Sequence, residues 1–231
     1  MAIIISIETA TTICSVAIHK NGTCIALSEI SEQNAHSSQL TVLLETMLRS
    51  HSLQIADCSA IAISQGPGSY TGLRIGTSVA KGLCYAANIP LIAVDTLQAL
   101  ALQAKKKHDI INTKSTILCP MIDARRMEVY TAEFSYNLQS LKSTYPLIVT
   151  ENTVTDFHAQ NTYYLFGDGS QKLTTILHQK NILYIPNITN SAESVGELAQ
   201  QKFLSKDFVD VAYFTPFYLK KFQTTTPKKQ I

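Results

Sequence analysis

Four glycines crowd into one short stretch of this chain, 66–76 (GPGSYTGLRIG), and three of them fall inside or just before an expected helix. Residues 59–64 (SAIAIS) alternate like a strand, and 79–87 continue an apolar helical pattern. The glycines therefore mark a strand-to-helix junction at which another group comes very close to the backbone. Free amides of a first helical turn favour anions, so this junction is a candidate anion site.

A Walker-type phosphate loop does not fit this segment. Its motif requires a first glycine, a second glycine, and then a lysine and a serine or threonine. When Gly72 is taken as the second glycine, the other positions hold Pro67, Leu73 and Arg74. The segment is therefore not a P-loop.

The composition indicates a globular protein without a marked charge. A chain of 231 residues with 45% hydrophobic content can bury a large core, in one large domain or two small ones. A net charge of +2 is too weak to indicate a nucleic-acid partner. The last lysines are expected to form a solvated end, although nucleic-acid contact stays open; they are Lys220, Lys221, Lys228 and Lys229.

The five cysteines are odd in number, widely spaced and mostly embedded in apolar runs: Cys14, Cys24, Cys58, Cys84 and Cys119. This pattern is typical of buried reduced thiols and predicts a cytoplasmic protein. The opening apolar run, 1–7, is too short to cross a membrane, and no charged leader or cleavage site accompanies it. We therefore expect neither secretion nor membrane insertion.

The first half of the chain alternates strand and helix signals. Apolar runs predict three consecutive strands, with Asn21-Gly22 as the hairpin turn between the last two. Apolar residues at helical spacing predict a one-faced helix over 37–50. After it follow the strand at 59–64, the glycine-rich helix, a buried strand at 91–94 and a helix from 96 to 107. This order implies a mixed sheet covered by helices.

The second half restarts the same pattern. An acidic residue ends a buried strand at Glu8 and again at Asp123. An apolar strand runs into the sequence Gly-x-Gly-Ser at Gly66 and again at Gly167. Two landmarks in the same order favour an internal duplication.

The polar stretch 105–114 (KKKHDIINTK) is the best boundary between these halves. It predicts an N-terminal domain, 1–106, which carries the partner-binding helices, and a C-terminal domain, 107–231. The last apolar stretch, 211–222, can pack back on either half.

Two tandem units of this kind resemble the actin-like ATPase superfamily, in which nucleotide lies between the domains. The chain is more specifically similar to the bacterial TsaB (YeaZ) family, through nearly its whole length. The motifs that carry the resemblance are 8–11 (ETAT), 65–76 (QGPGSYTGLRIG), Lys81-Gly82, 123–130 (DARRMEVY) and 216–220 (PFYLK). The resemblance implies an α/β fold of two tandem actin-like ATPase (ASKHA) domains, with mixed β-sheets covered by helices. It also implies a subunit of the complex that makes threonylcarbamoyladenosine in tRNA, beside a catalytic paralogue (TsaD) and a small ATPase (TsaE).

Actin-like ATPases cradle phosphate through an Asp-x-Gly-Thr type turn, and the matching turn here is 8–11. Ala10 adds a Cβ where glycine would permit close approach of the anion. Glu8 either hydrogen-bonds neighbouring backbone or acts with a metal, and we favour the structural role. The other candidate carboxylates have no motif that pairs them and are interpreted as turn or strand-end acids: Asp95, Asp123, Glu128 and Asp168.

Metal ligands are missing where the resemblance would place them. TsaD has a His-x-x-x-His pair after the strand that corresponds to 91–94, and the two positions align here with Thr96 and Leu100. No two histidines of this chain lie within a helical turn of each other, so no helix presents two imidazoles to a metal. We therefore expect no metal, no cofactor and no catalytic residue, which also argues against a glycoprotease.

The glycine-rich helix carries more apolar surface than one sheet contact requires, because its apolar residues cover about half of its circumference. Gly72, Gly76 and Ala80 form a small-residue ridge that lets another helix approach closely. From the residues alone, that neighbour is either the helix 37–50 or a partner's helix. The family resemblance favours the partner, because TsaB-like subunits pair through this domain. The predicted interface comprises Leu40, Leu44, Met47, Gly72, Ile75, Gly76, Val79 and Leu83.

The chain is thus predicted to be a non-catalytic subunit that dimerises with TsaD and supports threonylcarbamoyl transfer to adenosine in tRNA. We further expect TsaE as a partner, a homodimer in isolation, and tRNA contact only through the complex, if at all. Two alternatives stay open. One is an actin-like enzyme, either an ATP-dependent group transferase or a metallopeptidase, and the other is an independent homodimeric interaction protein without a role in tRNA.

Overall fold

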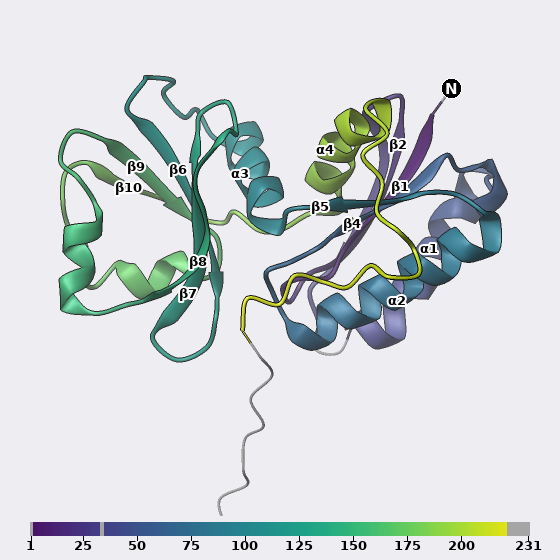
Figure 1. The fold of residues 1–231 in the computed structure, drawn as a ribbon, viewed down its shortest axis with the longest axis horizontal. Coiled ribbons are helices and arrows are strands. Elements are labelled where there is room, and N and C mark those ends of the chain that lie inside the picture. The colour runs from purple at the N-terminus through teal and green to yellow at the C-terminus, as the bar shows by residue number, and fades with distance from the viewer. Residues whose placement is uncertain (1, 33–34, 221–231) are drawn as a thin grey trace, which may run out of the picture.

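Two five-stranded sheets, one in each half of the chain, form the framework of the computed structural model (Figure 1). The structure describes residues 2–32 and 35–220. The first sheet has the order β3-β2-β1-β4-β5, from β1 (Ile3–Glu8), β2 (Cys14–Lys20), β3 (Thr23–Ile30), β4 (Ala60–Ser64) and β5 (Leu91–Val94). The second has the order β10-β9-β6-β7-β8, from β6 (Thr116–Asp123), β7 (Glu128–Ser135), β8 (Ser140–Ile148), β9 (Thr162–Phe166) and β10 (Ile182–Ile185).

The two sheets repeat one topology. β1 is antiparallel to β2 and parallel to β4, and β6 is antiparallel to β7 and parallel to β9. The central strands end on the two predicted acids, Glu8 in β1 and Asp123 in β6. The predicted duplication and the mixed sheets are therefore confirmed. Asn21 and Gly22 form the predicted hairpin turn, and both have positive φ (50° and 86°), as a type I′ turn requires.

Helices cover both faces of the first sheet. α1 (Ala35–Ser50) and α2 (Tyr70–Ala87) pack on one face, in a core that includes Ile5. α4 (Ala192–Leu204) packs on the other face, in a core that includes Ile4. Neighbouring residues of β1 serve both cores because successive side chains of a strand point to opposite faces. Figure 1 shows α4 on the opposite side of this sheet from α1 and α2.

Two helices cross between the halves. α3 (Thr96–Lys107) comes from the first half, yet its Leu100 packs with Leu118 and Phe166 of the second sheet. α4 comes from the second half and covers the first sheet. The predicted boundary at 106/107 falls in the last turn of α3. A cut there would separate the first sheet from the helix that covers one of its faces.

The other face of the second sheet is covered by short 3-10 turns and loops instead of long helices. The 3-10 turns of the second half are Glu151–Asp156 and Ser170–Leu173. A further 3-10 turn, Ile55–Asp57, belongs to the first half and does not cover this sheet. Leu173 and Leu177 pack there with Met121 and Leu165. None of the described helices has the length and apolar character that a membrane span needs.

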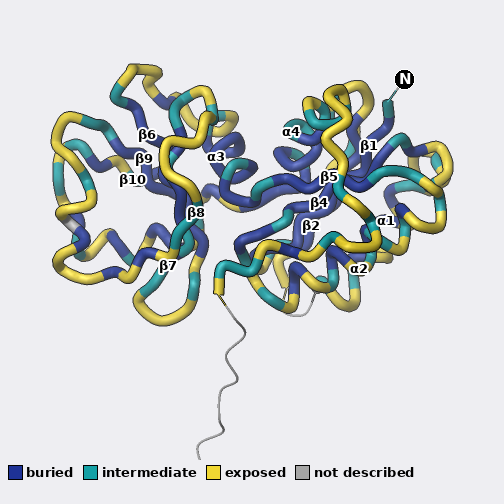
Figure 2. The backbone as a smooth tube through the Cα atoms, viewed as in Figure 1, coloured by how far each residue is buried: buried dark blue, intermediate teal, exposed yellow. Residues whose placement is uncertain are grey.

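The chain after α4 runs back over α2 and is largely exposed along its path (Figure 2). Three apolar residues of this segment pack on the first core: Val209, Val211 and Phe214. The amide of Phe217 donates to the carbonyl of Gln65 (2.7 Å). Lys220 forms an ion pair with Glu128 of β7. The described part of the predicted stretch 211–222 therefore lies on the first half and reaches the second at Lys220, and its last two residues lie outside the described residues.

Candidate functional site

The glycines of α2 accommodate the turn that follows β1. A Cβ at Gly72 would overlap the carbonyl oxygen of Thr9, and one at Gly76 would overlap the hydroxyl of the same residue. A Cβ at Gly68 would overlap the carbonyl oxygen of Ala10. The close approach that these glycines predict is present, and the group that approaches is the chain's own turn.

Protein groups accept two of the amides at the start of α2. The amide of Ser69 donates to the carbonyl of Ala10 (2.6 Å), and the hydroxyl of Ser69 accepts from the amide of Gly72 (3.2 Å) as an N-cap. This is the junction that the sequence indicated as a candidate anion site. A phosphate would have to displace the Ala10 carbonyl to reach the Ser69 amide, so the arrangement does not fit a phosphate cradle.

Glu8 braces the same turn from inside the protein. Its Oε1 accepts hydrogen bonds from the Ala10 amide (2.6 Å) and from the Ser64 hydroxyl (2.8 Å), whereas Oε2 has no partner among the described residues. Burial raises the pKa of Glu8 to about 7, and the hydrogen bonds from Ala10 and Ser64 oppose that rise. Near neutral pH the carboxyl group is therefore shared between its protonated and ionised forms. This geometry supports the structural role favoured for Glu8.

The two positions that align with metal-binding histidines are built into the fold. Thr96 begins α3, and its hydroxyl accepts a hydrogen bond from the Gly66 amide (2.9 Å). Leu100 is fully buried in the core of the second sheet. Within residues 2–32 and 35–220, no three His, Cys, Asp or Glu side chains are placed to hold a metal ion.

The fold itself occupies five of the eight residues of the predicted partner interface, which stays a proposal. Three of them belong to the core beneath α1: Leu40, Leu44 and Met47. The other two, Gly72 and Gly76, face the turn after β1. The helical spacing located an apolar face correctly, but in the structure that face covers the chain's own sheet and turn.

The remaining three predicted residues, Ile75, Val79 and Leu83, are half-buried at the margin of the same core. They stay available, at least in part, to a second helix. An interface built from them remains a proposal.

A second row of small residues on α2 faces solvent. This outer α2 row consists of Ser78, Gly82 and Ala86, all exposed, and no atom lies within 4 Å of a Cβ built on Gly82. Two large side chains of α1 and α2 are also exposed, Tyr85 on α2 (87%) and Val42 on α1 (50%). This row lies outside the predicted interface, although its spacing is the same as that of the inner row of Gly72, Gly76 and Ala80.

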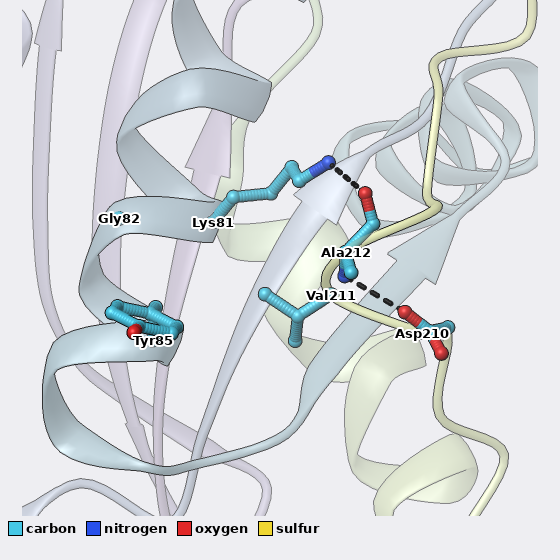
Figure 3. A pocket seen from close by; sticks show the side chains of 6 residues that line it. All are labelled: Lys81, Gly82, Tyr85, Asp210, Val211 and Ala212. Carbon is cyan, nitrogen blue, oxygen red and sulfur yellow. Dashed lines mark hydrogen bonds between the residues drawn. The ribbon is translucent and has the colours of Figure 1, made fainter.

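The C-terminal segment forms one wall beside the outer α2 row (Figure 3). Lys81 Nζ donates to the carbonyls of Ala212 (2.9 Å) and Phe214 (3.1 Å), which ties this segment to the helix. Two open hollows, of about 510 and 540 Å³, lie between α2 and the segment, and Lys81 lines both. Gly82 and Tyr85 line the first hollow, so a partner on the outer row would also meet the C-terminal segment.

Comparison with known proteins adds one family model, two relatives and one solved structure. Residues 29–188 match a family model described as TsaD, tRNA N6-adenosine threonylcarbamoyltransferase. The chain is 37% identical over 131 residues to the tRNA threonylcarbamoyladenosine biosynthesis protein TsaB of Escherichia coli (strain K12), a match that covers 57% of the chain and about half (54%) of that relative. It is 30% identical over 194 residues to the protein of the same name from Buchnera aphidicola subsp. Schizaphis graminum, which covers 80% of the chain and 89% of the relative. A solved structure from Pseudomonas aeruginosa, described as an uncharacterized protein with similarity to peptidase YEAZ, superposes with a TM-score of 0.81 at 25% identity, over 95% of this chain and 100% of that one.

Proposed function

This chain belongs to the bacterial TsaB (YeaZ) family, and we propose that it is a non-catalytic subunit of the machinery that makes threonylcarbamoyladenosine in tRNA. In this role it dimerises with a catalytic paralogue of the TsaD type and supports the transfer of the threonylcarbamoyl group to adenosine. The observation that carries the proposal is the start of α2, where the Ala10 carbonyl accepts the Ser69 amide that an anion would need. A fold whose candidate anion junction is occupied by its own backbone, and whose helix face is exposed, suits a protein that binds a relative.

The proposal includes further partners and a place in the cell. A TsaE-type ATPase joins the complex, and the chain forms a homodimer when alone. A two-fold homodimer uses the same patch on both copies, so homodimer and heterodimer would exclude each other if both use this face. The five cysteines are all unpaired, which suits the reducing cytoplasm.

We place the partner helix across the outer α2 row. Small side chains at Ser78, Gly82 and Ala86 let a second backbone approach closely. Ile75 and Val79 would add apolar contacts at the margin.

The substitution Gly82→Leu tests this placement. The Cβ that it adds meets nothing within 4 Å and the position is exposed, so the fold is expected to tolerate the substitution. A closely packed partner helix would be displaced, at a cost of about 1–3 kcal/mol, which corresponds to roughly 10- to 100-fold weaker pairing with TsaD. Calorimetry measures the heterodimer and light scattering the homodimer.

Gly82→Ala is the matched control, because it keeps the position small. It should assemble like the wild type. Val79→Glu is a less clean test, since Val79 also packs on the chain's own core. If Gly82→Leu melts normally and still binds TsaD with unchanged affinity, the outer α2 row is not the interface.

The enzyme alternative predicts different behaviour of the isolated chain. We expect the purified protein neither to retain stoichiometric zinc or iron nor to hydrolyse ATP, because Thr96 and Leu100 replace the imidazoles and Ala10 adds a Cβ to the phosphate turn. A bound metal that is lost on substitution of a histidine would instead indicate a metallopeptidase. A modification assay with and without this chain separates the proposal from an interaction protein without a role in tRNA.

A further inference from the structure

The turn between β6 and β7 presents two consecutive arginines that the rest of the fold does not use. Arg125 and Arg126 are exposed, and neither guanidinium forms an ion pair or hydrogen bond with the described residues. Both have positive φ (64° and 44°), a region that glycine and asparagine adopt far more readily than arginine. Within the described ranges, no other two consecutive non-glycine residues share this conformation.

Hydrogen bonds hold this turn in one shape. The amide of Arg125 donates to Asp123 Oδ1 (2.6 Å), and the amide of Ala124 donates to the carbonyl of Glu128 (3.2 Å). Lys172 Nζ donates to Asp123 Oδ1 (2.6 Å) and to the carbonyl of Glu128 (2.9 Å), so it joins the two ends of the turn. The arginines therefore project from a preorganised backbone, which lowers the entropy lost when they bind.

The carboxylates beside the arginines are already paired with lysines. Lys172 forms an ion pair with Asp123 (2.6 Å), and Lys220 forms one with Glu128. The charges of Arg125 and Arg126 are thus left for another molecule. The sequence after Lys220 adds three lysines and no acidic residue.

Two members of another basic run, Lys105–Lys107, are used within the fold. Lys106 forms ion pairs with Glu193 (2.8 Å) and Glu197 (2.6 Å). Lys105 Nζ lies 4.2 Å from the centre of the Tyr136 ring. The arginine turn is therefore a better candidate for an external anion than this longer run of cations.

We propose that Arg125 and Arg126 bind the sugar–phosphate backbone of the tRNA on which the complex acts. This inference rests on the proposed function and goes beyond the expectation that tRNA is contacted only through other subunits. Each guanidinium offers a planar set of donors that matches phosphate oxygens, and two adjacent ones on a rigid turn suit neighbouring phosphates. Such contacts position an RNA without reading its bases.

The double substitution Arg125→Asn with Arg126→Asn tests the contact. Asparagine tolerates positive φ, so the turn should keep its shape while both charges are lost. The matched control is Lys20→Asn with Lys180→Asn, which removes two exposed cations elsewhere. Binding of an unmodified tRNA transcript is measured by fluorescence anisotropy at several salt concentrations, with the isolated full chain and with its complex with TsaD.

The arginine variant should bind the transcript about tenfold or more weakly at low salt, and the slope of log affinity against log salt should shrink by about 1.5–2. The control pair should bind the transcript with wild-type affinity, and its slope of log affinity against log salt should also match the wild type. Melting curves verify the fold of each variant.

Two results would overturn the inference. One is an arginine variant that matches the control pair in affinity and slope in both preparations. The other is normal RNA binding with loss of assembly with TsaD, which would assign the arginines to an acidic protein surface. If the wild-type complex itself does not form, the proposed function fails, and the isolated chain still tests the RNA contact.

Discussion

Glu8 is a carboxyl group enclosed by the turn that it holds in place. Its type and position at the end of β1 were evident from the sequence, as was the missing glycine at Ala10. Its raised pKa was not, because it depends on burial by parts of the chain that are distant in the sequence, such as Ser64, 56 positions away, whose hydrogen bond opposes the rise. Residue types along one strand carry no information about such long-range enclosure.

The pKa of Glu8 makes stability depend on pH. Burial raises this pKa from 4.5 to about 7 in the folded chain, so the folded state holds a proton that the unfolded state releases. The free energy of unfolding should therefore fall as the pH rises from about 5 to about 7, by roughly 3 kcal/mol at most, and then level off. Glu8→Gln should lose this slope and be more stable than the wild type at about pH 8. Urea denaturation across this pH range measures both.

Glu45→Gln is the control for this experiment, because Glu45 is an exposed carboxylate on α1. It should keep the wild-type slope, since its charge stays in water. An unchanged slope in Glu8→Gln would show that Glu8 does not hold the extra proton.

At the scale of elements, α2 carries two rows of small residues with the same spacing. The sequence located the helix and its inner row, Gly72, Gly76 and Ala80, but not the side on which that row lies. The outer row has equal spacing, and glycine has no side chain whose polarity would separate an inner from an outer position. The neighbour of the inner row, the turn after β1, comes from about 60 residues earlier in the chain, a distance that helical periodicity does not sense.

The two rows should respond in opposite ways to a single methyl group. Gly76→Ala places a Cβ against the Thr9 hydroxyl and 3.2 Å from Ile63 Cδ1, and it should lower the free energy of unfolding by about 1–3 kcal/mol. Gly82→Ala places a Cβ in open space and should raise it by up to about 1 kcal/mol through helix propensity. Urea denaturation of both variants checks the sign. Equal effects would mean that the inner row is not closely packed.

β8, β10 and α4 escaped prediction, and the reasons for β8 and α4 differ. β8 lies at the edge of the second sheet and is mostly exposed, so it lacks the alternation that marks a half-buried strand. α4 contains Gly196, at which a Cβ would overlap the imidazole of His19. A glycine inside a helix weakens the helical signal, and the reason for it becomes clear only when α4 lies on β2.

At the scale of the molecule, two short landmarks were enough to predict the duplicated topology. Strand order and direction follow from a repeated pattern, and the repeat preserved the acids that end β1 and β6. The exchange of α3 and α4 between the sheets could not be predicted, because either helix has an apolar face that suits either sheet. A boundary drawn from polar residues at 105–114 therefore identifies a change of sheet and not a separable unit.

A fragment of residues 1–106 should not fold cooperatively. It lacks α4, so the face of the first sheet that includes Ile4 and Ile92 has no cover. Circular dichroism should show no cooperative melting transition. Fusion of residues 189–220 to the fragment through a flexible linker should restore one. Cooperative melting of the bare fragment would mean that α4 is dispensable for the first sheet.

The position of α4 also has a consequence during translation. The first sheet has all of its strands once Val94 is made, but α4 starts at Ala192, about 100 residues later. At ordinary rates of synthesis this is a delay of roughly 5–20 s. The second sheet and α3, which are contiguous in the sequence, are complete before α4 has left the ribosome. The lobe that is begun first is therefore finished last, and its uncovered apolar face is the part of the nascent chain that chaperones would meet.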